Sequence, residues 1–239
     1  MTIVQGAFAR GLEPILGLLQ QPDVQHALLI TFTLSFGAVL INTIAGLVVA
    51  WVLVRHKFPT RKFFRLAGRY TFCILSVIAG YAMIVLFGRN GWLVTTFIQI
   101  VFALPGILLA KTFVSLPFVI RELQPVLDAM SPEQEEAAYT VGASRWKTFV
   151  SIILPEIWTA LLYGVVLTFS RAVGEFGAVA VVSGAIEGLT ETATSFVFRA
   201  LNDRNNIGAY SMSVLLGLVS VIVLILMSIL KRRVVAPRR

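Results

Sequence analysis

Five long apolar stretches occupy most of this 239-residue chain and limit what it can fold into. They cover residues 27 to 54, 70 to 88, 97 to 120, 157 to 182 and 207 to 230, each bound approximate. Each stretch approaches the ~20 residues that an α-helix needs to cross the ~30 Å hydrocarbon core of a bilayer. Since a helix satisfies its own backbone hydrogen bonds in lipid, these spans are predicted to be helical. The pattern predicts an all-α membrane protein, a polytopic bundle of about five transmembrane helices.

Composition excludes an ordinary soluble domain. Apolar residues make up 57% of the chain and charged residues 13%. Soluble domains have roughly 45 to 50% apolar and about 25% charged residues. The net charge of +8 would suit a nucleic-acid binder, but the positions of the basic residues favour a different explanation.

The 20 Lys and Arg residues are sorted by loop, and this predicts the orientation in the membrane. Loops 55 to 69 and 121 to 156, together with the C-terminal tail, hold 14 of them, and the opposite set of loops holds four. Positively charged loops stay in the cytoplasm, so the N-terminus is predicted outside and the tail inside. The two remaining residues, Lys111 and Arg171, fall inside predicted spans. The four basic residues on the outer side are Arg10, Arg89, Arg199 and Arg204.

The predicted spans and orientation divide the chain into three segments. Residues 1 to 26 are predicted to be an external N-terminal segment, in which residues 7 to 20 have the spacing of a helix lying along the membrane surface. Residues 27 to 230 form the transmembrane domain. Residues 231 to 239 form a basic cytoplasmic tail.

The loop at residues 121 to 156 is longer than two membrane helices need for a connection, and its sequence predicts a helix. Ser131 is a suitable N-cap with Pro132 at the first helical position, and Gln134 has the spacing to reach back as a capping box. The acidic residues of this first turn suit the positive end of a helix; they are Glu133, Glu135 and Glu136.

A glycine turn and a second helix are predicted to follow. Gly142 suits the left-handed conformation that ends a helix, and Ser144 suits the cap of a helix over residues 145 to 154. Pro155 is expected to bias Leu154 away from helical geometry and to mark a bend toward the next span. From amphipathicity alone, a hairpin that rests on the bilayer remains an alternative.

The loop also carries the pattern Glu136-Ala137-Ala138, Gly142, Ile152-x-Leu154-Pro155. This pattern resembles the cytoplasmic coupling motif of the permeases of ATP-binding-cassette (ABC) importers, which docks into a groove of the ATPase subunit. The chain has no G-x-x-x-x-G-K-[ST] sequence. The resemblance therefore implies that this chain is not an enzyme and binds no cofactor, and that a separate ATPase uses the ATP and Mg²⁺.

Four further stretches resemble the permease subunits of sulfate/thiosulfate importers. The last of them contains a Gly-Glu-Phe-Gly-Ala run that is shared with molybdate and tungstate permeases, so import of those anions remains an alternative. The resemblance implies a multi-pass protein of the bacterial inner membrane with three kinds of partner: two ATPase copies, a second similar permease chain and an extracytoplasmic binding protein. The stretches are residues 86 to 93, 102 to 106, 116 to 123 and 171 to 178.

Lys111, Arg171 and Glu175 are the candidate residues of the translocation pathway. Lys111 and Arg171 are predicted near the middle of their spans at similar depth, where an isolated charge costs on the order of 3 kcal/mol. Glu175 follows Arg171 by four residues and is predicted to neutralise it in part. The resulting net positive charge suits passage of a small anion. An ion pair that only stabilises the bundle, and a Lys111 that extends to the interface, are the alternatives.

Leu104-Pro105-Gly106 is predicted to interrupt the third span, with a half-helix starting near Ile107. Broken membrane helices are tolerated where they line a cavity, although a simple proline kink would give the same sequence. No residues are assigned to catalysis or to a metal. A secondary transporter or channel driven by ion gradients is the alternative from another functional class.

Overall fold

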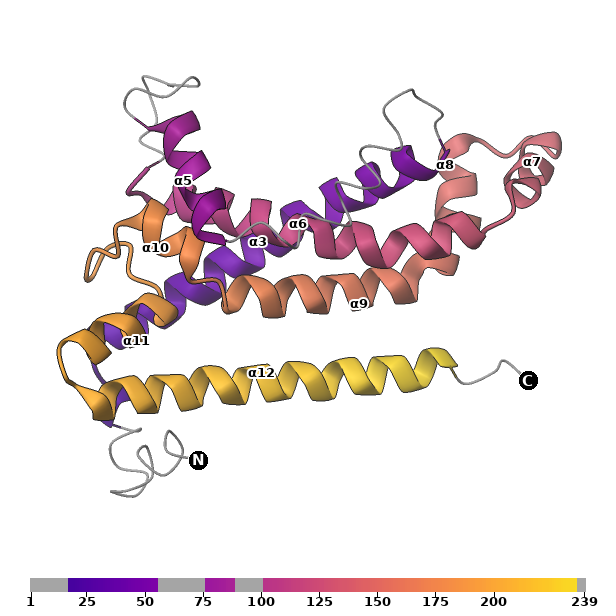
Figure 1. Ribbon diagram of the computed structural model, residues 1–239. Helices are drawn as coiled ribbons and strands as arrows, with labels where there is room; N and C mark the ends of the chain where they lie inside the picture. Colours follow the sequence, from indigo (N-terminus) through magenta and orange to yellow (C-terminus); the bar gives the residue numbers. More distant parts are fainter. Residues whose placement is uncertain (1–16, 56–75, 89–100, 236–239) are drawn as a thin grey trace. The chain divides into compact units, whose positions relative to one another are not determined.

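All regular elements in the described part of the chain are helical. The computed structural model describes residues 17–55, 76–88 and 101–235. Figure 1 labels the elements in chain order, and η2 is a short π-helix. The elements are α3 (Pro22–Arg55), α5 (Ser76–Phe87), α6 (Leu104–Ala129), α7 (Pro132–Thr140), α8 (Arg145–Thr148), η2 (Phe149–Ile153), α9 (Leu154–Val173), α10 (Gly177–Ser183), α11 (Ala193–Asn202) and α12 (Asn206–Val235).

In the described part of the chain, four helical runs are long and apolar enough to cross a membrane. They are α3, α6, the continuous run Arg145–Val173 that joins α8, η2 and α9, and the first 18 residues of α12. These runs confirm four of the five predicted spans and the all-α membrane class. In the second predicted span, the described part holds the 12-residue apolar helix α5. Residues 70 to 75 of that span lie outside the described residues.

Two helix boundaries differ from the predicted ones. α6 begins at Leu104, so the Leu-Pro-Gly sequence is the N-terminal turn of the helix; this suits Pro105, whose missing N–H is not needed there. α9 ends at Val173, and a separate helix begins at Gly177. The span predicted at residues 157 to 182 therefore ends earlier than predicted, because Gly174 and the capping group of Glu175 stop the helix.

The chain forms two compact units, and α3, α6, α9 and α12 each contribute one part to both. Of the described residues, unit 1 contains 17–39, 76–88, 101–114 and 169–225, and unit 2 contains 40–55, 115–168 and 226–235. The predicted segment limits at 26 and 230 stay a prediction, and residues 1–16 and 236–239 lie outside the described residues. The described start of the chain already joins unit 1, since Leu18 and Val24 are buried in its core.

Close packing of α5 on α10 is a defining contact of unit 1, and Figure 1 shows these helices next to each other. Glycines on both helices allow it. A Cβ added to Gly80 would lie 2.8 Å from Cα of Ala178, and a Cβ added to Gly177 would meet Oγ of Ser76. Such distances are shorter than side chains tolerate, so the two backbones touch only because these positions are glycine.

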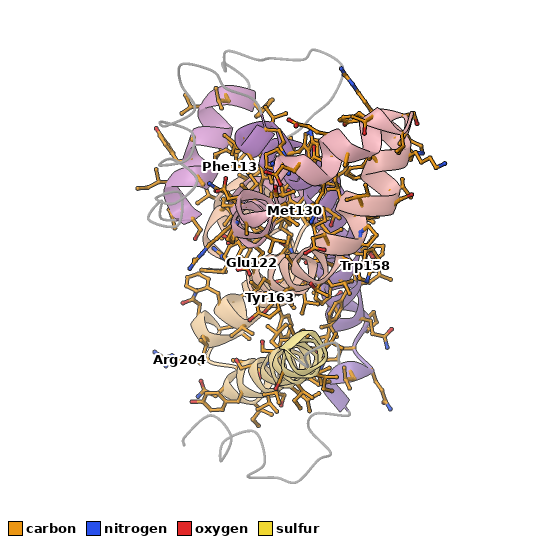
Figure 2. All side chains as sticks on the ribbon, turned by 90° about the vertical axis from the view of Figure 1, so that its right-hand side faces the viewer. Phe113, Glu122, Met130, Trp158, Tyr163 and Arg204 are labelled. Atoms are coloured by element: carbon orange, nitrogen blue, oxygen red, sulfur yellow. The ribbon has the colours of Figure 1, made fainter. Side chains whose placement is uncertain are left out.

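The core of unit 2 consists of apolar residues from α3, α6 and the η2–α9 run. On α6 and on the η2–α9 run they recur every four residues, which places them on one face of each helix. Met130 lies among the packed side chains in Figure 2, whereas Trp158, 49% exposed, lies at the margin. The buried cluster is Ala50, Val54, Val119, Leu123, Leu127, Met130, Ile153, Ile157 and Leu161.

Candidate functional site

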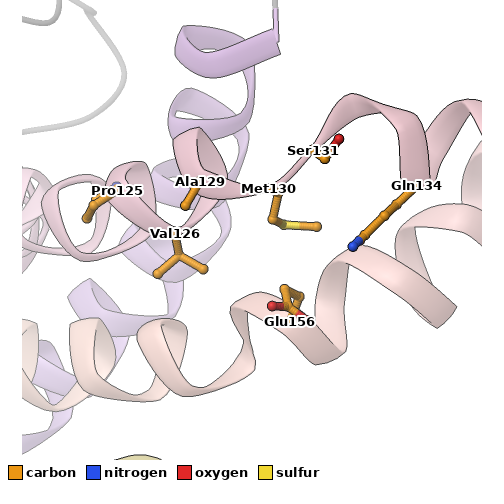
Figure 3. Close-up of a pocket in the computed structure, with 7 residues that line it drawn as sticks. All are labelled: Pro125, Val126, Ala129, Met130, Ser131, Gln134 and Glu156. Carbon is orange, nitrogen blue, oxygen red and sulfur yellow. The ribbon is translucent and has the colours of Figure 1, made fainter.

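Residues 131–155 are the segment predicted to couple to an ATPase, called the coupling hairpin below, and this segment begins as the sequence predicts. Ser131 is the N-cap of α7, and its hydroxyl accepts a hydrogen bond from the N–H of Glu133 at 3.3 Å. Pro132 occupies the first helical position. The side chain of Gln134 does not reach back to Ser131 as the predicted capping box requires. It points into a neighbouring pocket instead (Figure 3).

The predicted glycine turn is confirmed. Gly142 has φ of +81°, and its N–H donates to the carbonyl of Tyr139 at 3.0 Å. The next N–H, that of Ala143, donates to the carbonyl of Ala138 at 3.0 Å. These two bonds form the Schellman arrangement that ends a helix through a left-handed residue. The second cap is also confirmed, because Ser144 accepts from the N–H of Lys147 at 3.3 Å.

The non-helical geometry predicted at Leu154 is wrong. Leu154 has helical angles, φ −59° and ψ −43°, and the helix runs without a break from Arg145 to Val173. A π-turn over Phe149–Ile153 lies directly before it, and the N–H of Leu154 donates to the carbonyl of Phe149. A proline ring inside a regular helix meets the carbonyl four residues earlier. The wider π-turn relieves that conflict and keeps the helix continuous.

The motif residues divide between an exposed and a buried face. Glu136 and Ala137 are exposed, Ala138 is 8% exposed and faces inward, and Gly142 lies exposed at the turn. At the other end of the hairpin, Ile152 and Leu154 are half-buried and Pro155 is exposed. Two large apolar side chains stand out on the exposed side, Val141 at 84% and Trp146 at 73% exposure.

An ion pair that the sequence does not reveal ties the hairpin to α3. The guanidinium of Arg55, at the end of α3, pairs with the carboxylate of Glu135, and Arg55 Nη1 also donates to the carbonyl of Met130 at 3.5 Å. Both side chains of the pair are mostly buried, with 16% and 11% exposure. The guanidinium carbon also lies 5.7 Å from the centre of the Trp51 ring. The sequence places Glu135 in the first turn of a helix but gives no sign of a partner 80 residues away.

A pocket of about 430 Å³ lies on the inner side of the hairpin, within unit 2. In Figure 3, Met130 and Gln134 reach into the space in front of Glu156, which belongs to the first turn of α9. The hairpin is therefore fastened to α3 by the Arg55 ion pair and leaves unfilled space toward α9. The lining residues are Pro125, Val126, Ala129, Met130, Ser131, Gln134 and Glu156.

In unit 1, the structure brings Lys111, Arg171 and Glu175 together. Arg171 and Glu175 form the predicted ion pair. Arg171 lies two residues before the end of α9, so its predicted place in the middle of a span is wrong; the helix break at Gly174 explains the difference. Lys111 lies next to the end of α9, since Lys111 Nζ donates to the carbonyl of Ala172 at 2.9 Å; the similar depth of Lys111 and Arg171 in the membrane stays a prediction.

Lys111 is fully buried, at 0% exposure, and donates to several acceptors. Besides Ala172, its ammonium donates to Oγ of Ser35 at 2.8 Å and to the carbonyl of Thr31 at 3.4 Å. It therefore does not extend to the membrane surface. A buried ammonium needs such partners because the desolvation of an unpaired charge costs several kcal/mol.

The same polar network reaches α10 and α11. Glu175 is 1% exposed, and its Oε1 accepts from the N–H of Ala178 at 2.9 Å, in the first turn of α10. The carbonyl of Glu175 accepts from Oγ1 of Thr194 at 3.0 Å, and Oγ1 of Thr31 accepts from the N–H of Ala193 at 2.8 Å. These Thr and Ser partners are missed by sequence reasoning, since single hydroxyl residues in apolar helices carry no distinguishing pattern.

The connection between α10 and α11 carries its own charge cluster. Arg199 makes a bidentate contact to Glu191, at 2.7 Å and 3.0 Å, and also pairs with Glu187 at 3.0 Å. The hydrogen bond that Arg199 donates to the carboxylate of Glu191 is the main cause that raises the pKa of Arg199. Within residues 17–55, 76–88 and 101–235, no group of three or more His, Cys, Asp or Glu side chains is arranged to hold a metal ion.

Comparison with solved structures defines the class of this fold. The crystal structure of a bacterial ABC transporter involved in the import of the acidic polysaccharide alginate matches with a TM-score of 0.77 and 16% identity, covering 97% of this chain and 88% of that chain. The alginate ABC transporter in complex with an alginate pentasaccharide-bound periplasmic protein matches equally well, with a TM-score of 0.77 and 15% identity over 98% and 88% of the two chains. The fold is that of an ABC importer transmembrane domain.

Sequence comparison then identifies the family. Residues 42–236 match the model of the binding-protein-dependent transport system inner membrane component, and the chain belongs to this family. It is 45% identical to the sulfate transport system permease protein CysW of Synechocystis sp., over 95% of this chain and 84% of the relative. It is 41% identical to the protein of the same name in Escherichia coli, over 95% and 79% of the two chains, and 38% identical to the Escherichia coli permease CysT, over 78% and 69%.

Proposed function

We propose that this chain is a transmembrane permease subunit of an ATP-driven importer of sulfate or thiosulfate. The observation that carries the proposal is the identity of 41 to 45% with sulfate permeases over 95% of the chain. The coupling hairpin supports the ATP-driven part, because its motif residues lie on a folded unit that is fastened to the membrane helices. The chain is a membrane subunit, and ATP hydrolysis belongs to a partner.

The proposed complex contains this chain, a second similar permease chain, two copies of an ATPase that uses ATP and Mg²⁺, and an extracytoplasmic binding protein. Relatives named as two different sulfate permeases, CysW and CysT, support a paired permease. The fold shared with an alginate transporter in complex with a periplasmic protein supports the last partner. The excess of basic residues in alternate loops supports a cytoplasmic C-terminus.

Coupling is proposed to run through two rigid connections in the hairpin. When ATP closes the ATPases, they push on the exposed residues around Glu136 and Gly142. The continuous helix Arg145–Val173 carries this displacement into α9 without slack. The Arg55–Glu135 ion pair carries it into α3. Ala137, Ala138, Ile152, Leu154 and Pro155 complete the proposed coupling residues.

The proposed translocation pathway includes Lys111, Arg171 and Glu175. Two cations and one carboxylate leave a net positive charge, which attracts an anion. Partial neutralisation keeps that attraction weak enough for release, as transport requires.

The coupling assignment is tested by co-purification of the ATPase with variants of this chain. Glu136→Lys reverses an exposed charge on α7, and it is expected to reduce ATPase retention and ATP-dependent uptake about tenfold or more, the effect of a lost interfacial charge contact. The control is Asp203→Lys, a charge reversal at another exposed residue, in unit 1, which should retain the ATPase. If Glu136→Lys and Gly142→Ala both leave association and ATP-dependent uptake intact, the proposal fails.

A further inference from the structure

The break between α9 and α10 carries opposite charges on its two helix ends. Lys111 donates to Ala172, one of the last carbonyls of α9, where a cation is favourable. Glu175 accepts from the N–H of Ala178 in the first turn of α10, where an anion is favourable. The two buried charges also interact electrostatically with each other. The break is therefore held by a buried cation and a buried anion.

The three charged residues differ in how exposed their side chains are. Lys111 and Glu175 are 0% and 1% exposed. Arg171, which pairs with Glu175, has a side chain that is 32% exposed. A guanidinium has five N–H donors in a fixed fork, so one carboxylate partner leaves donors for a second anion. Of the three groups, Arg171 is the one that an anion outside the protein core can reach.

Lys111 contributes to the net charge of the site even though an anion cannot reach it. Glu175 faces two cations, the exposed Arg171 and the buried Lys111. The three together carry one net positive charge. Without Lys111, Arg171 and Glu175 would form a neutral pair that no longer attracts an anion.

We propose that Arg171 contacts the transported anion, and that Lys111 is a positioning residue that offsets the charge of Glu175 and holds the carbonyl end of α9. This inference rests on the proposed function, since it assumes that an anion is carried. It assigns separate roles to two cations that the sequence alone places in one site.

Two double variants with the same net charge test this division. Lys111→Met/Glu175→Gln keeps the exposed cation, and Arg171→Gln/Glu175→Gln keeps the buried one. Glutamine at 175 retains an oxygen that can accept from Ala178, and Ser35 stays bonded because its hydroxyl donates to the carbonyl of Thr31 at 2.6 Å. The readout is the initial rate of binding-protein-dependent uptake of labelled sulfate by the whole complex in proteoliposomes. Complex yield and ATP hydrolysis are measured in parallel.

Each single variant, Lys111→Met and Arg171→Gln, is expected to lower uptake about tenfold or more, because the site loses its net charge. Adding Glu175→Gln should restore most of the uptake of Lys111→Met and none of the uptake of Arg171→Gln. If Lys111 only held the carbonyl end of α9, a change at residue 175 would not restore uptake.

The outcomes also separate this inference from the proposed function. A wild-type complex without sulfate uptake would contradict the proposed function itself. If the wild type transports but neither double variant does, or if both recover equally, the division of roles is wrong. If Lys111→Met/Glu175→Gln fails to assemble while the Arg171 double variant assembles, Lys111 is structural and the inference is overturned.

Discussion

Gly142 shows how a single residue determines the geometry of the coupling hairpin. Its φ of +81° lies in the region that side chains with a Cβ avoid. The two hydrogen bonds of the turn depend on this conformation, because they bring the N–H groups of residues 142 and 143 back to carbonyls of α7. The space around Gly142 is open, so the constraint is on the backbone and not on packing.

Replacement of Gly142 by alanine is therefore expected to destabilise the hairpin by about 1 to 2 kcal/mol, the cost of a left-handed alanine. Asparagine should cost less than alanine because it tolerates this region better. The measurement is the thermal unfolding midpoint of the purified complex, together with uptake per ATP hydrolysed. Gly217→Ala is the control, since a Cβ there also meets open space but its φ is not positive; it should not lower the midpoint, because alanine favours a helix over glycine, and it should leave uptake per ATP unchanged. Equal effects at the two positions would refute the backbone explanation.

At the scale of elements, the hairpin is fixed by contacts with two different helices. The π-turn joins it to α9, and the Arg55–Glu135 pair joins it to the end of α3. Phe149 adds to the contact, because its ring lies 6.2 Å from that of Trp51 and 5.8 Å from that of Trp146. We therefore expect a displacement of α7 to reach both membrane helices.

Pro155→Ala tests the link to α9. Alanine restores an N–H that can donate to the carbonyl of Ser151, so we expect a regular α-helix in place of the π-turn. An α-turn holds one residue fewer than a π-turn, so this conversion rotates the preceding helix α8 by about 100° relative to α9. The rotation turns the exposed face of α8 away from the proposed ATPase. We expect unchanged or higher thermal stability with severalfold less uptake per ATP hydrolysed. Pro132→Ala, at the first position of α7, is the control and should leave coupling unchanged. A Pro155→Ala complex with normal coupling would contradict this account.

A double-mutant cycle of Arg55→Gln and Glu135→Gln tests the link to α3. Exposed ion pairs contribute about 0 to 1 kcal/mol, and breaking a fully buried one costs about 3 to 5 kcal/mol. Because this pair is mostly buried, the expected coupling energy is about 1 to 3 kcal/mol in chemical unfolding of the complex. Glu133 is exposed on the same helix, and its variant Glu133→Gln should show no coupling to Arg55. A coupling energy near zero for the first pair would remove α3 from the proposed route.

The elements that sequence predicts well are those set by neighbouring residues. Ser131, Gly142 and Ser144 act on groups within five residues, so their caps and turn follow from local chemistry. Pro155 was expected to act locally at Leu154, but the helix accommodated it by widening the turn before it. The Arg55–Glu135 pair joins residues far apart in the chain, and no local rule selects one carboxylate of the three in that turn.

For the whole molecule, apolar length predicts the membrane class, because a run of about 20 apolar residues has few alternatives to a spanning helix. The position of helix ends is less predictable from hydropathy. The run at residues 157 to 182 stays apolar through the break, and only the capping of Ala178 by Glu175 shows where α10 starts. The acceptors of Lys111 come from α3 and α9, so its burial depends on the assembled unit.

Family membership and the folded coupling hairpin together describe a subunit that moves an anion by using ATP hydrolysed elsewhere. The identity of that anion is inferred from the relatives of this chain. The Gly-Glu-Phe-Gly-Ala run at residues 174 to 178 resembles the run in molybdate and tungstate permeases, which makes molybdate and tungstate the natural competitors in a test.

Uptake of labelled sulfate into proteoliposomes is the most direct test of the central claim. The vesicles contain this chain, its second permease chain and the ATPase, and the binding protein is added to the side on which the substrate is supplied. We predict accumulation that requires ATP, is competed by excess thiosulfate and is little affected by molybdate. Uptake that follows an ion gradient without ATP, or that is abolished by molybdate in preference to thiosulfate, would contradict the account.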